Sequence, residues 1–128
     1  MPYDVRQWPQ SVYPGEAQRE CAEAIEVIDT LILNMRREGP RPTGYRVKTL
    51  GAAKVGLWQV NLKVHKRQVR ILYAPYDGDK IVLFRVHRKG SPEEQERAYE
   101  LAADRKRQYE RDRELARRAR NDGNRTLH

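Results

Sequence analysis

Residues 57–65 alternate strictly between apolar and polar side chains, and this run restricts the possible folds more than any other segment. A period of two residues is typical of a β-strand with one face on a hydrophobic core and the other in water. The positions expected to face the core are Trp58, Val60, Leu62 and Val64. The positions expected on the opposite face are Gln59, Asn61, Lys63 and His65. The chain therefore contains an amphipathic strand whose polar face is positively charged.

Further strands are expected around this run, at about residues 2–8, 45–50, 68–75 and 80–88. Asp77-Gly78-Asp79 is a tight-turn sequence between two apolar segments, so the last two strands should form an antiparallel hairpin. This hairpin is more continuously apolar than the earlier strand, which favours a position in the middle of the sheet.

A helix is predicted before the strands. Between Glu16 and Glu38 the apolar residues recur at steps of three and four, which predicts one amphipathic helix that ends at Gly39. The single cysteine, Cys21, lies on this apolar stripe and is expected to be buried as a small hydrophobic residue. One cysteine also excludes an internal disulfide and a cysteine-rich zinc site.

A second helix is predicted after the strands, beginning behind the N-cap Ser91 and running to about Asn121, with Gly123 as its stop. Its sheet-facing stripe is expected to consist of Ala98, Leu101, Ala102, Arg105 and Tyr109. Its second half is strongly basic, and is either a solvated helix or a segment that holds RNA through phosphate contacts.

The order of these elements predicts an α+β fold. We expect one domain over residues 1–110, with a small, twisted, mainly antiparallel sheet of four or five strands. The N-terminal helix should pack on this sheet and the C-terminal helix should close the domain. Residues 111–128 are expected to form a basic helical extension.

Positive charge is concentrated in the predicted strands. The 128-residue chain has a net charge of +8, and between Gly39 and Tyr76 it has eight Lys or Arg residues and no Asp or Glu. Cations without a neighbouring carboxylate attract phosphate groups, so nucleic acid is the favoured partner, and a merely solvated basic face is the alternative. The residues expected to contact RNA are Arg46, Lys48, Lys54, Lys66 and Arg67.

Several other classes of protein are disfavoured. No apolar run approaches the roughly 20 residues that span a bilayer, and the N-terminus lacks the apolar segment of a signal peptide. His65, His87 and His128 are too scattered in sequence for a metal site, so no metal or other cofactor is expected. These features predict a soluble, cytoplasmic protein that does not associate with a membrane.

Six short motifs follow one another between residues 45 and 109. They are Lys48-Thr49-Leu50-Gly51, Gly56-Leu57-Trp58, Val69-Arg70-Ile71-Leu72-Tyr73, Asp77-Gly78-Asp79-Lys80-Ile81-Val82-Leu83, His87-Arg88-Lys89 and Ala102-x-x-Arg105-x-x-x-Tyr109. Their order and spacing resemble the RelE/ParE toxin superfamily, and most closely its phage-derived, HigB-like branch. The chain departs from that branch at Gln59-Val60-Asn61, where members often have Glu-Leu-Arg.

The resemblance implies the toxin of a type II toxin–antitoxin pair, a metal-independent endoribonuclease that cleaves mRNA on the ribosome and so inhibits translation. In that reaction a ribose 2′-hydroxyl attacks the adjacent phosphate, which requires a base, an acid and fixed positive charge. The implied partners are mRNA, the ribosome and a cognate antitoxin, in most cases a small helix-turn-helix protein. Two alternatives remain open: a ParE-like inhibitor of DNA gyrase, and a phage accessory protein that only binds nucleic acid or protein.

Three catalytic candidates lie on the two middle strands. Arg70 matches the arginine with which the family grips the scissile phosphate, and we expect it to be an exposed clamp. Lys63 matches a lysine near that phosphate. His65 is on the same polar face, and an imidazole is a suitable base at neutral pH.

Three further candidates lie at the end of the last predicted strand. Alternation predicts that His87 and Lys89 share one face and supply acid and anion-binding groups. Arg88 then takes the other face, unless a bulge reverses the register.

Overall fold

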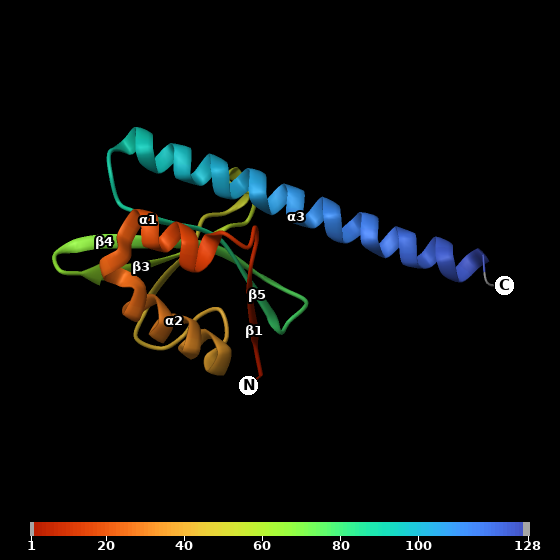
Figure 1. Cartoon of the computed structure of the whole chain (residues 1–128), viewed down its shortest axis with the longest axis horizontal. Helices are drawn as coiled ribbons and strands as arrows, with labels where there is room; N and C mark the ends of the chain where they lie inside the picture. The colour runs from red at the N-terminus through yellow and green to blue at the C-terminus, as the bar shows by residue number, and fades with distance from the viewer. Residues whose placement is uncertain (1, 127–128) are drawn as a thin grey trace.

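The computed structural model describes residues 2–126, and places the side chains of residues 2–123. The elements are, in order, β1 (Asp4–Gln7), a π-turn (Val12–Glu16), α1 (Ala17–Cys21), a 3₁₀ turn (Ala22–Ala24), α2 (Ile25–Glu38), β2 (Arg46–Thr49), a 3₁₀ turn (Ala52–Lys54), β3 (Trp58–Val64), β4 (Arg67–Tyr76), β5 (Lys80–Arg88) and α3 (Pro92–Thr126). The predicted α+β class is confirmed, with a sheet between the N-terminal helices and the long C-terminal helix (Figure 1).

The sheet has five strands in the order β1-β5-β4-β3-β2. The pairs β2–β3, β3–β4 and β4–β5 are antiparallel, whereas β1 runs parallel to β5, so the sheet is mixed. The hairpin of β4 and β5 has neighbours on both sides, as its apolar sequence predicted. The hairpin of β3 and β4 closes at the pair Val64–Arg67 through His65 and Lys66, whose positive φ angles of 49° and 67° suit a two-residue hairpin turn.

One face of the sheet packs against α1 and α2. The predicted core positions Val60, Leu62 and Val64 of β3 lie in this layer and are at most 5% exposed, and Trp58 packs at its margin. Cys21 is fully buried in the same layer, as predicted, and its burial raises the pKa of the thiol to about 11. The thiol therefore stays protonated and acts as a small apolar group.

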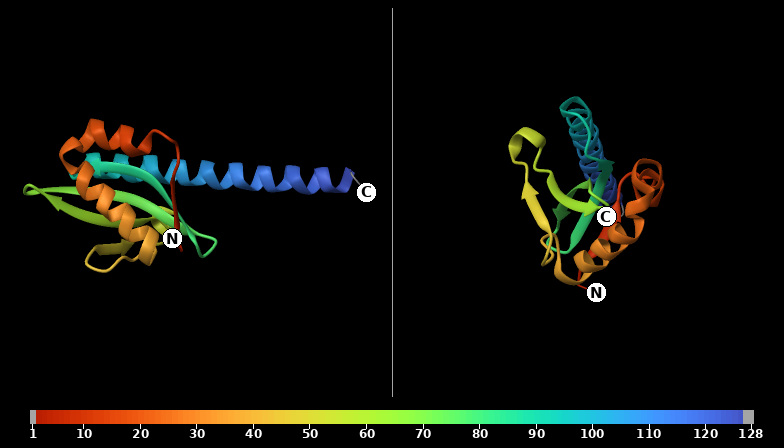
Figure 2. Two further views of the ribbon diagram at one scale, coloured as in Figure 1. Left: turned by 60° about the horizontal axis from the view of Figure 1, so that its bottom comes forward. Right: turned by 90° about the vertical axis from the view of Figure 1, so that its left-hand side faces the viewer.

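The opposite face packs against the first half of α3, which gives three layers (Figure 2). Phe84 of β5 and Tyr76 of β4 meet Tyr109 of α3, with ring centroids 5.8 Å and 5.2 Å from that of Tyr109. Tyr109 thus packs against the core, as its place on the apolar stripe predicted, whereas Leu101 of the same predicted stripe is 38% exposed. Because α3 contacts β4, β5 and the turn at Ala52–Lys54, it leaves the outer part of β2 and β3 uncovered.

The N-terminal helix is not continuous, so the prediction of one helix over residues 16–38 is wrong. The chain leaves helical geometry at Cys21 (φ −158°, ψ 61°), and α1 and α2 run in different directions (Figure 1). The apolar spacing of Ala17, Cys21, Ala24 and Ile28 survives the break, since all four are fully buried. Periodicity alone therefore could not reveal the change of direction.

The C-terminal helix begins where predicted, because the Ser91 hydroxyl accepts a hydrogen bond from the backbone N–H of Glu94 at 3.2 Å. It does not stop at Gly123 but continues to Thr126. Its second half extends beyond the sheet (Figure 1). No helix in the described part of the chain combines the length and apolar character that a membrane crossing requires.

Candidate nucleic-acid interface

The predicted site residues do not form one cluster. Some lie beneath α3, others are bound to carboxylates, and a third group is exposed on β2 and at the end of the β3–β4 hairpin. His128 lies outside the described residues, and among the side chains that are described no three His, Cys, Asp or Glu residues gather as metal ligands would.

Arg70 lies beneath the first turns of α3. In the sheet register it stands between Asn61 of β3 and His87 of β5. Its Nη1 donates hydrogen bonds to the Gln95 amide oxygen and to the Tyr99 hydroxyl, both on α3. The expectation of an exposed clamp is therefore wrong for this conformation, because the side chain is only partly accessible and its guanidinium joins the sheet to the helix.

His87 is also covered by α3 and is only 3% exposed. Burial and, next in size, the neighbouring Arg85 cation lower its pKa to about 4. Its Nδ1 lies 3.3 Å from the Arg88 carbonyl oxygen, so Nδ1 carries the proton of the neutral ring. At neutral pH the ring is therefore mainly neutral, which disfavours the predicted role of His87 as the acid.

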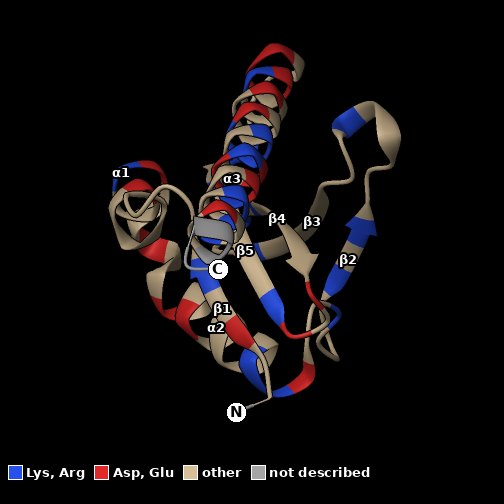
Figure 3. Ribbon diagram, turned by 90° about the vertical axis from the view of Figure 1, so that its right-hand side faces the viewer, with Lys and Arg blue, Asp and Glu red and all other residues tan. Residues whose placement is uncertain are grey.

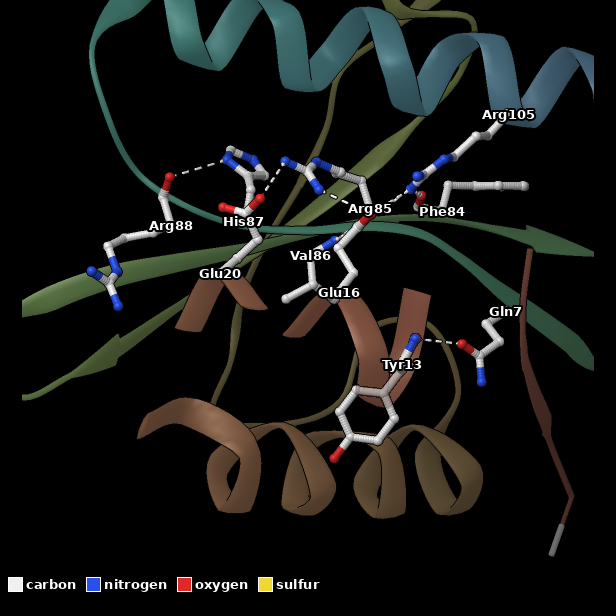
Figure 4. A network of polar contacts seen from close by, with 10 residues as sticks. All are labelled: Gln7, Tyr13, Glu16, Glu20, Phe84, Arg85, Val86, His87, Arg88 and Arg105. Atoms are coloured by element: carbon white, nitrogen blue, oxygen red, sulfur yellow. Dashed lines mark hydrogen bonds and ion pairs between the residues drawn. The ribbon is translucent and has the colours of Figure 1, made fainter. Parts of the chain in front are cut away.

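A buried ion-pair network lies beside His87 (Figure 4). Glu16 is only 2% exposed, and its carboxylate lies 2.9 Å from Arg85 and 3.0 Å from Arg105. It also accepts the backbone N–H of Val86 at 2.9 Å, while Arg105 donates to the Phe84 carbonyl at 2.7 Å. The side chains of Glu16 and Arg105 therefore provide hydrogen-bond partners for backbone groups of β5 at the edge that β1 does not reach.

Sequence reasoning took Glu16 only as the first residue of the predicted helix and so missed this network. A signal was present elsewhere, because Arg105 falls on the apolar stripe of the last helix and Arg85 interrupts the apolar run of the last strand. Arginine in such positions is rarely buried unless it is paired. The pattern indicated a missing buried acid without identifying which one.

Arg88 and Lys54 are bound to carboxylates on other elements. Arg88 lies 2.6 Å from Glu23, on the face of the sheet that α1 covers. The predicted alternation therefore holds, although His87 and Arg88 both line one open cavity of about 270 Å³ at the end of β5, which Glu20 and Glu94 also line. Lys54 lies 2.8 Å from Glu96 of α3, with its ammonium 5.1 Å from the centre of the Tyr99 ring. Both cations are at least partly neutralised within the chain.

Seven of the predicted residues are exposed and have no ion pair to a described acidic side chain. Five of these seven lie on β2, β3 and the β3–β4 turn, and together we call them the open basic surface. They are Arg46 and Lys48 of β2, Lys63 of β3, and His65 and Lys66 in the β3–β4 turn. No ion pair joins them to any acidic side chain that the structure describes. Figure 3 shows β2 and the loop after it with basic residues and without acidic ones. This surface has the charge and the accessibility that phosphate binding requires.

Two other predicted residues are exposed near this surface without belonging to it. Arg67 alternates with the buried Val69 along β4, so it takes the face that α1 and α2 cover. Lys89 follows β5, and its backbone N–H donates to the Gln68 carbonyl oxygen at 2.9 Å.

An open cavity of about 570 Å³ adjoins the open basic surface. It lies where β2 separates from β3, and its lining consists of Val27, Gly44, Tyr45, Arg46, Asn61, Leu62, Lys63 and Gln68. None of these residues is acidic, so the cavity has the same charge as the surface beside it.

Comparisons with protein-family models, with curated proteins and with solved structures found no match to this chain.

Proposed function

We propose that this chain is a translation-inhibiting toxin of the RelE/ParE kind that binds mRNA through the open basic surface. The observation that carries the proposal is the set of five exposed side chains, in a stretch without any carboxylate, that have no ionic partner in the described structure. Cations that are solvated rather than paired can exchange their counterions for phosphates at little cost.

If the bound RNA is cleaved, the geometry favours Lys63 and His65 for the chemistry. Both are accessible and lie at one end of the β3–β4 hairpin. His65 would take the proton of the ribose 2′-hydroxyl, and Lys63 would stabilise the charge that develops on the attacked phosphate. As the bond from phosphorus to the 5′-oxygen breaks, solvent water would protonate the leaving oxygen. Arg70 is hydrogen-bonded to α3 and His87 is buried beneath it, so this conformation offers neither side chain freely to RNA.

A second candidate function is binding without cleavage, as in an accessory protein. It is favoured by the positions of Arg70 and His87, because these two catalytic candidates hold α3 on the sheet or are buried beneath it. The two candidates share the same RNA-binding surface and differ only in chemistry.

A partner that neutralises the toxin would have to cover the same surface. We propose that a cognate antitoxin does so with an acidic segment, which gains Coulomb energy against cations that have no internal partner. The association rate of such a pair should fall as salt rises, because surface charges are screened within about 10 Å at 0.1 M salt.

The deciding experiment is induced expression in bacteria, with translation rate and transcript ends measured together. The nuclease proposal predicts translation arrest with cut transcripts, and loss of both in the Lys63→Ala and His65→Ala double variant. Arg37→Ala is the control, since it removes an exposed cation from α2. Arrest without cut transcripts supports the binding candidate, and purified protein that does not bind RNA contradicts both.

A further inference from the structure

The pairing of β2 with β3 ends abruptly beside the 570 Å³ cavity. The Leu50 N–H donates to the Leu57 carbonyl oxygen at 2.9 Å, so these opposite residues form a hydrogen-bonded pair of the ladder. Such pairs recur at every second residue, and the last of them within β2 joins Arg46 to Asn61. The next pair would join Gly44 to Lys63, but the chain turns away at Gly44, whose φ is +88°.

The backbone of Lys63 is therefore left open. Its N–H and C=O point out of the sheet edge towards the cavity that Gly44 and Lys63 line, and no hydrogen bond joins their backbones in the described structure. The turn confirms this direction independently. The backbone N–H and C=O of Val64 point towards β4, where Val64 pairs with Arg67. Because these directions alternate along a strand, the backbone N–H and C=O of Lys63 must point away from β4.

Four side chains around this opening can bind the phosphate or the base edge of a nucleotide. Arg46 and Lys63 supply positive charge, and Asn61 and Gln68 supply amide groups. The Asn61 amide oxygen accepts a bond from Gln59 at 3.1 Å, which leaves the amide nitrogen of Asn61 available as a donor.

The other wall of the cavity includes a fixed aromatic ring. Tyr45 is partly exposed, and its hydroxyl accepts a hydrogen bond from Asn34 of α2 at 3.0 Å. That bond holds the ring in place beside Val27, which lines the same wall. Aromatic rings in this setting are common contact surfaces for bases of single-stranded nucleic acids.

We propose that this cavity binds one unstacked nucleotide of a single-stranded RNA. The proposal rests on the RNA-binding function proposed above, and adds the form of RNA and the place where a base is held. The phosphates contact Arg46 and Lys63, and the base edge meets Asn61, Gln68 and the free backbone of Lys63. The cavity volume lies within the range of about 300–1,000 Å³ that small-molecule sites occupy.

Two features favour a nucleotide over an added β-strand from a peptide. Before the turn at His65, only Lys63 has a backbone N–H and C=O that are free to pair with another strand. A peptide strand bound through one residue would have no defined register. A base edge needs only one donor and one acceptor side by side, which is what one residue supplies. Single-stranded RNA is required because the base edges of a duplex are already paired.

The test is fluorescence anisotropy with the full chain and a labelled single-stranded RNA 10-mer of mixed sequence, beside a duplex of the same sequence. Asn61→Ala and Gln68→Ala should each weaken single-strand binding about threefold to tenfold, the usual range for one hydrogen bond. Neither should change the slope of affinity against salt, because amides release no counterions. Arg46→Ala should weaken binding and reduce that slope by about one, while Arg37→Ala, with the same loss of charge on α2, should have little effect.

The outcomes separate the cavity from the RNA-binding surface. Gln68 is exposed, so its removal should not disturb folding, which circular dichroism checks for every variant. If both amide variants bind as wild type does while Arg46→Ala is weak, the nucleotide site is wrong and the RNA-binding surface stands. If wild type binds neither RNA, the proposed function fails as well. A polyglutamate peptide that binds with the same dependence on Asn61 and Gln68 would assign the cavity to a protein partner instead.

Discussion

The sheet face on the side of α3 has two halves that carry the same kinds of basic residue. The residues are buried and bonded in one half and exposed in the other. The half on β4 and β5 presents Arg70, Arg85 and His87, and α3 covers it. The half on β2 and the end of β3 near the β3–β4 turn presents Arg46 and Lys63, and these side chains are open to water. In the covered half each arginine side chain donates to oxygens of other residues, whereas in the open half the cations have no ionic partner among the described residues.

Desolvation explains the contrast. A cation that leaves water must find a carboxylate, a carbonyl or another acceptor, or its burial costs several kcal/mol. Glu16, Gln95 and the Phe84 carbonyl oxygen meet this need beneath α3. The open half has no such requirement, so its cations stay solvated and available to phosphates. A residue type that suggests catalysis in the sequence can therefore be structural on one half of a sheet and functional on the other.

The largest effect is expected in the covered half, from Glu16→Ala. The substitution leaves Arg85 and Arg105 without their shared carboxylate and the Val86 N–H without its acceptor. We expect a loss of about 3–5 kcal/mol in the free energy of unfolding, measured with urea at pH 7. Glu20→Ala is the matched control, because Glu20 makes one ion pair with Arg85 from an exposed position and should cost less than about 1 kcal/mol. Equal losses in the two variants would contradict the assignment of Glu16 as the centre of the network.

The pH dependence of stability should come next in size, through His87. Its pKa falls from about 6.5 to about 4 on folding, so between these values the unfolded chain binds more protons. Stability should therefore fall as the pH falls, by about 1.4 kcal/mol per pH unit from this group and about 3 kcal/mol in all. His87→Gln should remove this part of the pH profile in urea unfolding, and His65→Gln, in the exposed turn, should keep it. A profile that is the same in wild type and His87→Gln would mean that the ring is not buried.

The smallest effects are expected from single alanine substitutions of basic residues, which should lower stability in the covered half and RNA affinity in the open half. Arg70→Ala should cost about 1–3 kcal/mol of stability, because it removes the hydrogen bonds to Gln95 and Tyr99, and should change RNA affinity by less than about twofold. Lys63→Ala should change stability by less than about 0.5 kcal/mol and weaken RNA binding severalfold. Urea unfolding and anisotropy on both variants provide the measurement. An Arg70→Ala protein that keeps full stability but loses toxicity would restore Arg70 as the phosphate clamp.

Most of the elements could be predicted from the sequence, because helix and strand periodicity is a local property. The alternation in residues 57–65 identified the core positions of β3, and the turn at Asp77–Asp79 identified the central hairpin. Local patterns failed where distant parts of the chain decide the geometry. They showed neither the break after Cys21 nor the parallel pairing of β1 with β5.

The candidate site was predictable as a set of residue types but not as a place. Charge along the chain determined that cations would gather on the sheet without carboxylates between them. Only the tertiary structure decided which of them remain free, because that depends on α3 lying across β4 and β5 and on contacts such as that of Glu16 with Arg105, 89 positions apart. The cations that α3 covers become structural, whereas those on β2 and at the end of the β3–β4 hairpin stay exposed and available to phosphates. The division between the two groups follows from packing that no local pattern encodes.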